Sequence, residues 1–166
     1  TNSSNVRLNV TNSGTFGNAF RGYRNGTGNP SCEYPAGSGV EHVFESGIWF
    51  GGFINGTNIA VSTSSVDAPQ GYVTGGAGFE FYPEVGSRLQ EISSLRNSPY
   101  YSPNAVSHQD FVATFSDKNT LVPGTNTQIG AHLNPLFVDV KLRTFNWNYS
   151  FSDFFVIVDI ELQNNG

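Results

Sequence analysis

Apolar and polar residues alternate along much of the chain with the two-residue period of a β-strand. Residues 5–11 alternate in this way and end at Asn12-Ser13-Gly14, which predicts a strand followed by a turn. Residues 40–44 begin a second such region, and residues 110–116 carry the signal again. We therefore expect strands in all three places.

The strongest local signal is a β-hairpin over residues 48–64. Two runs of apolar and β-branched residues flank the pair Asn55-Gly56. An Asn-Gly pair readily adopts the positive φ angles of a tight hairpin turn, so the sequence predicts two antiparallel strands joined here. Within the first strand, Gly51-Gly52 indicates either a bulge or a place where another segment of the chain lies close.

Residues 137–149 combine two apolar phases. The apolar side chains first occupy even positions, from Val138 to Leu142, and then odd positions, from Phe145 to Tyr149. Because a change of phase within a strand needs an extra residue, we predict a bulge near residues 143–145.

The last apolar run covers residues 154–162. Its first half is apolar at every position and its second half alternates, which predicts a central strand covered on both sides at its start and half-exposed at its end. The turn signal Asn164-Asn165-Gly166 follows it, so we expect it to point toward a further strand.

Helical spacing is confined to residues 87–95, where Leu89, Ile92 and Leu95 lie three apart and predict one short helix closed by Ser98-Pro99. Residues 14–39 are rich in Gly, Asn and Pro and predict a long ordered loop. The whole pattern predicts a single all-β domain over residues 1–166, a β-sandwich of the immunoglobulin-like or jelly-roll-like kind. We expect about eight to ten short strands and at most one short helix.

The composition indicates where the protein is located. The chain has 18 Asn, 18 Ser and 12 Thr but only 2 Lys, and 13% of its residues are charged. Surfaces rich in amides and hydroxyls are typical of extracellular or cell-surface proteins. From the start at Thr1 we expect a chain that has been processed. The net charge of -5 without a basic stripe argues against a nucleic-acid partner. No apolar run approaches the roughly 20 residues of a membrane span.

Two residue types raise the question of modification. Five Asn-x-Ser/Thr sequons are acceptor sites for N-glycosylation: Asn2, Asn9, Asn25, Asn55 and Asn148. The single cysteine, Cys32, cannot form an internal disulfide. It is either a small buried apolar residue or a thiol that links to another subunit or an attached group.

Catalytic and metal-binding patterns are missing from the sequence. His42, His108 and His132 occur singly, outside any zinc-binding motif. Ser107, His108 and Asp110 are the residue types of a hydrolytic triad but lie too close together in the sequence, so we expect His108 and Asp110 to bond to backbone. Nothing pairs the carboxylates that a glycosidase would need, whose candidates are Glu33, Glu41, Glu45, Glu80 and Glu84. We expect no enzymatic activity, no cofactor and no metal.

Four stretches resemble a known family. They are SCEYPAGSG at residues 31–39, GIWFGG at residues 47–52, SHQDFVATFSD at residues 107–117 and WNYSFSDFFVIV at residues 147–158. In this order they are similar to the β-rich N-terminal part of large exported surface proteins of Bacteroidota-type bacteria, which are mostly of unknown function. The resemblance implies further strands, adhesive or fibronectin-like modules and often a type IX secretion signal. Either such a longer protein continues after this chain, or the chain is a short relative.

An apolar strand such as residues 154–162 recruits other chains when it lies at a bare sheet edge. One way to satisfy this edge is a strand from a neighbouring copy, for example residues 5–11; the alternative is that residues 5–11 fold into their own sheet. Repeated head to tail, the exchange gives a filament. The sequence therefore predicts a structural subunit or module of an extracellular filament or surface layer, whose partners are copies of itself. The residues expected to carry the assembly are Val6, Leu8, Val10, Phe154, Val156, Val158, Ile160 and Leu162.

The alternative function is a carbohydrate-binding or adhesive module with glycans as partners. Exposed aromatic rings form the sugar platform of such modules, and Trp49 and Trp147 are the candidates. Against this, most aromatic residues of a sandwich lie in its core, and the phase of Trp147 favours the core.

Overall fold

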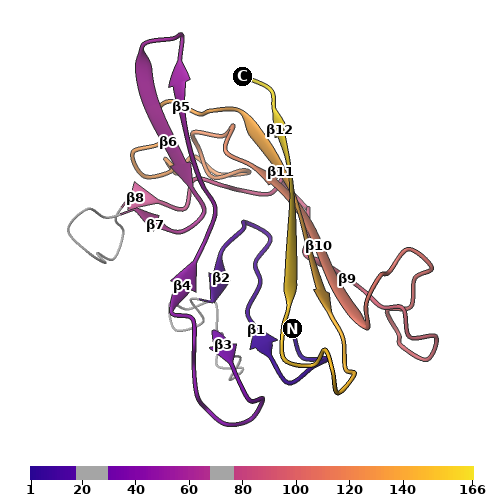
Figure 1. Cartoon of the computed structure of the whole chain (residues 1–166). Helices are drawn as coiled ribbons and strands as arrows, with labels where there is room; N and C mark the ends of the chain where they lie inside the picture. Colours follow the sequence, from indigo (N-terminus) through magenta and orange to yellow (C-terminus); the bar gives the residue numbers. More distant parts are fainter. Residues whose placement is uncertain (18–29, 68–76) are drawn as a thin grey trace.

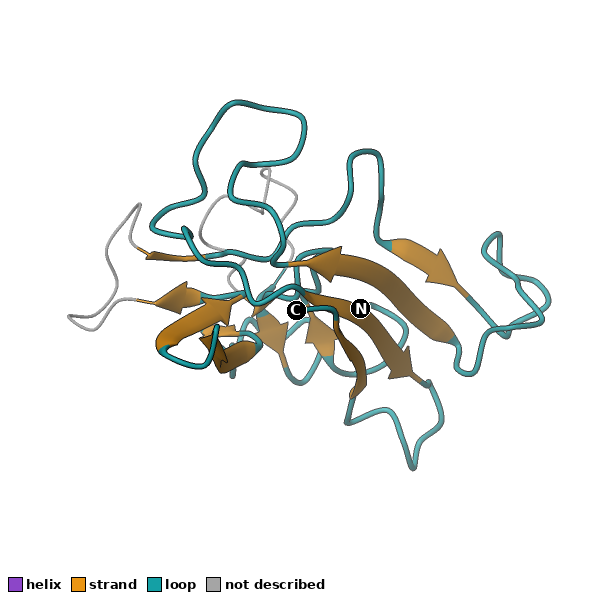
Figure 2. Cartoon of the chain, turned by 90° about the horizontal axis from the view of Figure 1, so that it is seen from above, coloured by secondary structure: helices purple, strands orange, loops and turns teal. Residues whose placement is uncertain are grey.

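The computed structural model describes residues 1–17, 30–67 and 77–166 (Figure 1). These residues form β-strands joined by turns and loops, with no helix (Figure 2). The all-β prediction is therefore confirmed for this part of the chain, which also holds no helix able to cross a membrane. The strands are β1 Arg7–Leu8, β2 Phe16–Gly17, β3 Cys32–Glu33, β4 Glu45–Ser46, β5 Trp49–Ile54, β6 Asn58–Thr63, β7 Val66–Asp67, β8 Ala77–Gly78, β9 Gln90–Ile92, β10 Gln109–Ser116, β11 Val138–Asn146 and β12 Ile157–Asn164.

The largest element is a four-stranded antiparallel sheet with the order β12-β11-β10-β9. Its long strands keep an unbroken register, from Gln109↔Asn146 to Ser116↔Asp139 between β10 and β11. The β11–β12 register is equally continuous. The prediction of a bulge near residues 143–145 is therefore wrong.

The apolar phase of β11 misled the prediction because polar residues occupy the core face. Thr144 and Asn146 are fully buried on the same side as Val140 and Leu142. Asn146 is held there by hydrogen bonds, since its Nδ2 donates to Ser4 Oγ at 2.6 Å. A buried amide is tolerated where such partners exist.

The hydrophobic core lies against this face of the sheet. Ala113, Phe115, Val140 and Leu142 from β10 and β11 pack with Phe81. The other members of the core come from the first third of the chain: Val10, Phe16 and Ile48. The short strands β1 to β4 thus belong to segments that cover one face of the sheet.

The hairpin predicted over residues 48–64 is confirmed as β5 and β6, which stand at the top of Figure 1. Asn55 and Gly56 have φ angles of 52° and 71°, as the turn requires. No bulge interrupts β5, because Gly51 and Gly52 pair in register with Val61 and Ala60. The other prediction for this glycine pair, that another segment of the chain lies close, is correct. A Cβ added at Gly52 would lie 3.1 Å from the Cδ2 atom of Leu136.

Other predicted elements are wrong or shorter than expected. Residues 87–95 form no helix; β9 lies within them and pairs with β10. Residues 40–44 contain only an isolated bridge at Glu41, and the strand β4 begins at Glu45. Residues 5–11 contain the two-residue strand β1 and a bridge at Val10. Residues 18–29 and 68–76, which include part of the predicted loop 14–39, lie outside the described residues.

Candidate assembly edge

The strand β12 forms one edge of the four-stranded sheet. It pairs with β11 on one side, and no strand among the described residues pairs with its other side. Residues 154–162 were predicted to be a central strand, which is wrong: Phe154 and Val156 precede the strand, and Phe154 lies in a turn. The sequence pattern is that of a covered strand, whereas the position is that of an edge.

The side chains of β12 are exposed on the face that carries the core. Val158, Ile160 and Leu162 lie beside the buried Thr144, Leu142 and Val140 of β11, respectively. They nevertheless remain 38%, 38% and 53% exposed. We name these three residues the β12 apolar row. The core that covers β11 therefore stops short of β12.

The backbone of the same residues points toward the open side. The Asn165 N–H donates to the Phe137 carbonyl at 2.9 Å, so these two residues form a hydrogen-bonded pair. Because such pairs alternate along an antiparallel ladder, the odd-numbered residues of β12 bond to β11. The N–H and C=O groups of the β12 apolar row point outward, as a template for another strand.

A groove of about 530 Å³ lies between β5 and the end of β12. Phe50 and Phe53 line the groove from β5, and Leu162 lines it from β12. Leu136 and Phe137 also line it. The groove is thus apolar where the open edge ends.

The opposite face of β11 and β12 is charged. Arg143 bonds to Asp159 at 2.5 Å and to Glu161 at 2.7 Å, while Lys141 lies 3.4 Å from Glu161. A second hollow of about 480 Å³ on the sheet is lined by charged residues that include Lys118, Lys141 and Glu84, and also by Leu162. In the same hollow a hydrogen bond from Lys118 to Glu84 raises the pKa of that lysine. β12 therefore presents an apolar row on one face and acidic residues on the other.

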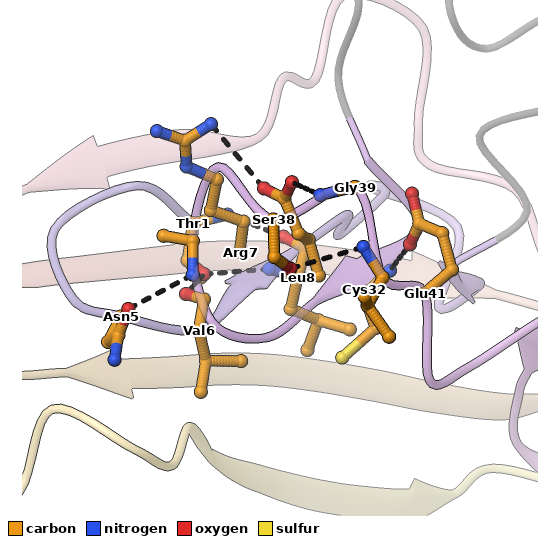
Figure 3. Close-up of polar contacts among 12 residues, drawn as sticks. Thr1, Asn5, Val6, Arg7, Leu8, Cys32, Ser38, Gly39 and Glu41 are labelled. Atoms are coloured by element: carbon orange, nitrogen blue, oxygen red, sulfur yellow. Dashed lines mark hydrogen bonds and ion pairs between the residues drawn. The ribbon is translucent and has the colours of Figure 1, made fainter.

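The N-terminal segment lies within its own fold (Figure 3). β1 pairs with β3, and Arg7 lies 3.5 Å from Glu33. Val6 and Val10 are buried, and Leu8 packs against the core. The structure thus has the alternative arrangement in which residues 5–11 pair within their own chain.

Burial lowers the pKa of the Thr1 ammonium to about 6.

The two tryptophans lie in different surroundings. Trp49 is 55% exposed on β5, and its Nε1 donates to Ser65 Oγ at 2.9 Å. Trp147 is half-buried and packs against Phe145 and Phe155. The ring contacts found among the described residues do not join the two tryptophans. Beyond β11, the rings of Tyr149 and Phe151 stack with their centroids 5.3 Å apart.

The sequons differ in accessibility. Asn55 in the hairpin turn and Asn148 after β11 are exposed. The amide of Asn9 is half-buried and donates to the Gly17 carbonyl at 2.6 Å. Asn2 is exposed and accepts a hydrogen bond from Gln109. Asn25 lies outside the described residues.

The histidines and the serine-histidine-aspartate stretch have structural contacts. The Asp110 carboxylate accepts from the backbone N–H groups of Val106 and Ser107, and His108 Nδ1 accepts from the Asn148 N–H. The backbone bonding predicted for His108 and Asp110 is confirmed. His132 Nε2 bonds to the Asp117 carbonyl. Residues 1–17, 30–67 and 77–166 contain no group of three His, Cys, Asp or Glu able to hold a metal ion.

The glutamates considered for catalysis also have local partners. Glu45 accepts from Val66 N–H, Glu80 from Thr63 N–H and Glu41 from Cys32 N–H, each within 2.7 Å. Glu33 accepts from Gly39 N–H. These carboxylates thus satisfy backbone donors in loops and strand ends. The Cys32 thiol is free and half-buried; its pKa is raised by burial and, to a lesser extent, by Glu41.

The sequence reasoning missed a second open edge, on β6. Ile59 and Val61 share the outer face of the hairpin with Trp49 and Phe53, and all four are exposed. The sequence carried no signal for this edge, because a run such as β5, apolar at odd and even positions alike, predicts burial on both faces. No family model, curated protein or solved structure matches the chain.

Proposed function

We propose that this domain is a structural module that assembles with copies of itself through β-strand contacts, in an extracellular filament or surface layer. The observation that carries the proposal is the open edge of β12, where the β12 apolar row exposes side chains together with backbone groups that no strand of the described residues pairs. An edge of this kind favours pairing with another strand. The role is structural rather than catalytic.

The fold supports this role in a second way. Segments from the first third of the chain pack on one face of the four-stranded sheet, and we propose that the two form the layers of a β-sandwich. A sandwich with an open edge gains hydrogen bonds by adding a strand without rearranging its core. The amide-rich and hydroxyl-rich composition and the resemblance to exported surface proteins support an extracellular location.

The test is the size of the purified chain as its concentration rises. We expect light scattering and negative-stain microscopy to show concentration-dependent assembly. The variant Ile160→Lys places a charge in the middle of the β12 apolar row and is expected to remain monomeric, because a lysine on an edge strand prevents pairing.

The matched control is Val106→Lys, which adds the same charge at an exposed apolar residue in the loop before β10. This variant is expected to assemble like the unmodified chain. A well-folded chain that stays monomeric at every concentration would contradict the proposal.

A carbohydrate-binding module is the second candidate, supported by the exposed ring of Trp49. Its indole N–H is already bonded to Ser65, which holds the ring in place, and exposed rings of this kind can stack on a sugar. Binding on a glycan array would favour this function if Trp49→Ala abolishes the binding and Trp147→Phe, at the half-buried tryptophan, leaves it intact. A negative array would remove its support.

A further inference from the structure

We propose that the open edge of β6 in one copy pairs with the open edge of β12 in the next, in an antiparallel arrangement that repeats head to tail. This inference rests on the proposed function and names the two surfaces that meet. It starts from three long strands among the described residues, β5, β6 and β12, each with one open side at exposed apolar residues. The middle of the β5 edge is Gly51, which offers no side chain for packing, so β6 is the stronger candidate of the two hairpin strands.

The backbone of β6 points outward at the same residues that are exposed. The Ser64 N–H donates to the Ile48 carbonyl at 2.9 Å, so the even-numbered residues of β6 bond to β5. The odd-numbered residues therefore point outward, and the Thr63 carbonyl accepts from Glu80 N–H on that side. Ile59 and Val61 are left with outward backbone groups and side chains 75% and 44% exposed.

The two edges match in parity. In an antiparallel pair, residues whose backbone groups point at the partner lie directly opposite one another, with their side chains on one face. Val61 then lies opposite Val158, and Ile59 lies opposite Ile160. The pair joins two exposed rows of β-branched residues, a combination that stabilises neighbouring strands.

Charge disfavours a second β12 as the partner of β12. If β12 paired with a second β12 about Ile160, Asp159 would lie opposite Glu161 of the other copy, and like charges at that distance are destabilising. In the β6–β12 register, Ala60 lies opposite Asp159 and Asn58 lies opposite Glu161. β6 contains no charged residue, so nothing in it opposes the acidic face of β12.

The space beside β12 also favours an added strand. At Leu162 the open edge runs into the groove of about 530 Å³ between β5 and β12, whose walls include Phe50 and Phe137. In the proposed register this groove gives room to the turn of the incoming hairpin, Asn55-Gly56-Thr57, with Thr57 opposite Leu162. Because β6 and β12 are different surfaces, the contact is heterologous, and repetition gives an open-ended filament rather than a closed dimer.

The contact area sets the expected strength. One pair of strands of five or six residues buries less than the roughly 1,200 Å² of a stable interface, so each single contact is weak. We therefore expect monomers in dilute solution and assembly only at high concentration.

Cysteine cross-linking between two differently labelled copies tests the pairing. In a Cys32→Ser background, one copy carries Asn58→Cys and the other carries Glu161→Cys, two exposed positions that lie opposite each other in the proposed register. At concentrations that give assembly, oxidation is expected to form the mixed dimer at least about tenfold faster than either variant alone forms its own dimer, because pairing raises the local concentration of the two thiols.

The control replaces Glu161→Cys by Asn104→Cys, an exposed loop residue that gives the rate of random collision. Cross-linking at that rate in the mixture, or faster dimers of Glu161→Cys alone, overturns the β6–β12 pairing. If scattering still shows assembly, only the choice of surfaces fails. If the chain is monomeric throughout, the proposed function fails with it.

Discussion

The four-stranded sheet ends differently at its two sides. The β9 side is short and closed: β9 has three residues, and the loop after it bonds back, with Ser93 N–H donating to the Tyr100 carbonyl and Ser102 N–H donating to the Ser93 carbonyl. The β12 side is eight residues long and open. Short edges and covering loops are the usual protection against unwanted strand pairing. Among the described residues, one edge of the sheet is thus protected and the other is left open.

The N-terminal segment strengthens the closed side. Gln109 of β10 donates from Nε2 to Asn2 Oδ1 at 2.7 Å and to Glu91 Oε1 of β9 at 2.8 Å. The amide thus ties the chain start to the two strands at that side of the sheet. No comparable side-chain network links the open side of β12 to another described segment. The difference between the two sides leads to four predictions.

The largest expected contrast is in amide hydrogen exchange. In dilute monomer, the Ile160 N–H points to solvent, whereas the Leu142 N–H bonds to β10 in the centre of the sheet. We expect the Leu142 amide to exchange at least about a thousandfold more slowly, since central strands open only with much of the fold. NMR-detected exchange measures this. Equal protection in the monomer would mean that the β12 edge is covered.

The same contrast applies to leucine truncation. Leu142 is fully buried, so Leu142→Ala is expected to lower the free energy of unfolding by about 3 kcal/mol. Leu162 is half-exposed at the edge, and Leu162→Ala is expected to cost less than about 1 kcal/mol. Denaturant unfolding of the two variants in dilute solution compares identical chemical changes. Similar losses would show that β12 is packed as tightly as β11.

The third prediction concerns pH and the chain start on the closed side. Burial lowers the pKa of the Thr1 ammonium from 8.0 to about 6, so between these values the unfolded chain binds more protons than the folded chain. Stability should therefore rise by up to about 2 to 3 kcal/mol from pH 6 to pH 8. Unfolding of the 166-residue chain as a function of pH measures it.

N-terminal acetylation is the control for this effect, because it removes the titrating group. The acetylated chain is expected to lose the rise in stability between pH 6 and pH 8. A rise of the same size in both forms would assign the effect to another group.

The sequence was informative where strand periodicity and turn chemistry act locally. The Asn55-Gly56 turn with its flanking strands, and the strand at Gln109–Ser116, followed from residues close together in the chain. The segment that contains β9 was misread, because Leu89, Ile92 and Leu95 have helical spacing while β10 supplies a strand partner from a distance. Tertiary pairing decides such short segments.

The candidate site was predictable only in part. The apolar alternation of Val158, Ile160 and Leu162 was visible, but periodicity does not tell whether a neighbour lies on one side or on both. Likewise, the burial of the polar Asn146 in the core was not predictable, because its hydrogen-bond partner Ser4 lies 142 positions away in the sequence. Sheet order and long-range polar contacts are set by the whole fold.

The smallest expected effect concerns the ion pairs between β11 and β12. Arg143 bonds to Asp159 and Glu161, and all three side chains are partly exposed, at 34%, 38% and 50%. Water and salt screen such pairs, so Arg143→Ala is expected to lower the free energy of unfolding by less than about 1 kcal/mol. The difference should shrink in high salt, with Arg88→Ala as a control at an exposed arginine. A loss above about 2 kcal/mol that salt leaves unchanged would show that these charges, rather than the backbone ladder with β11, hold the edge strand in place.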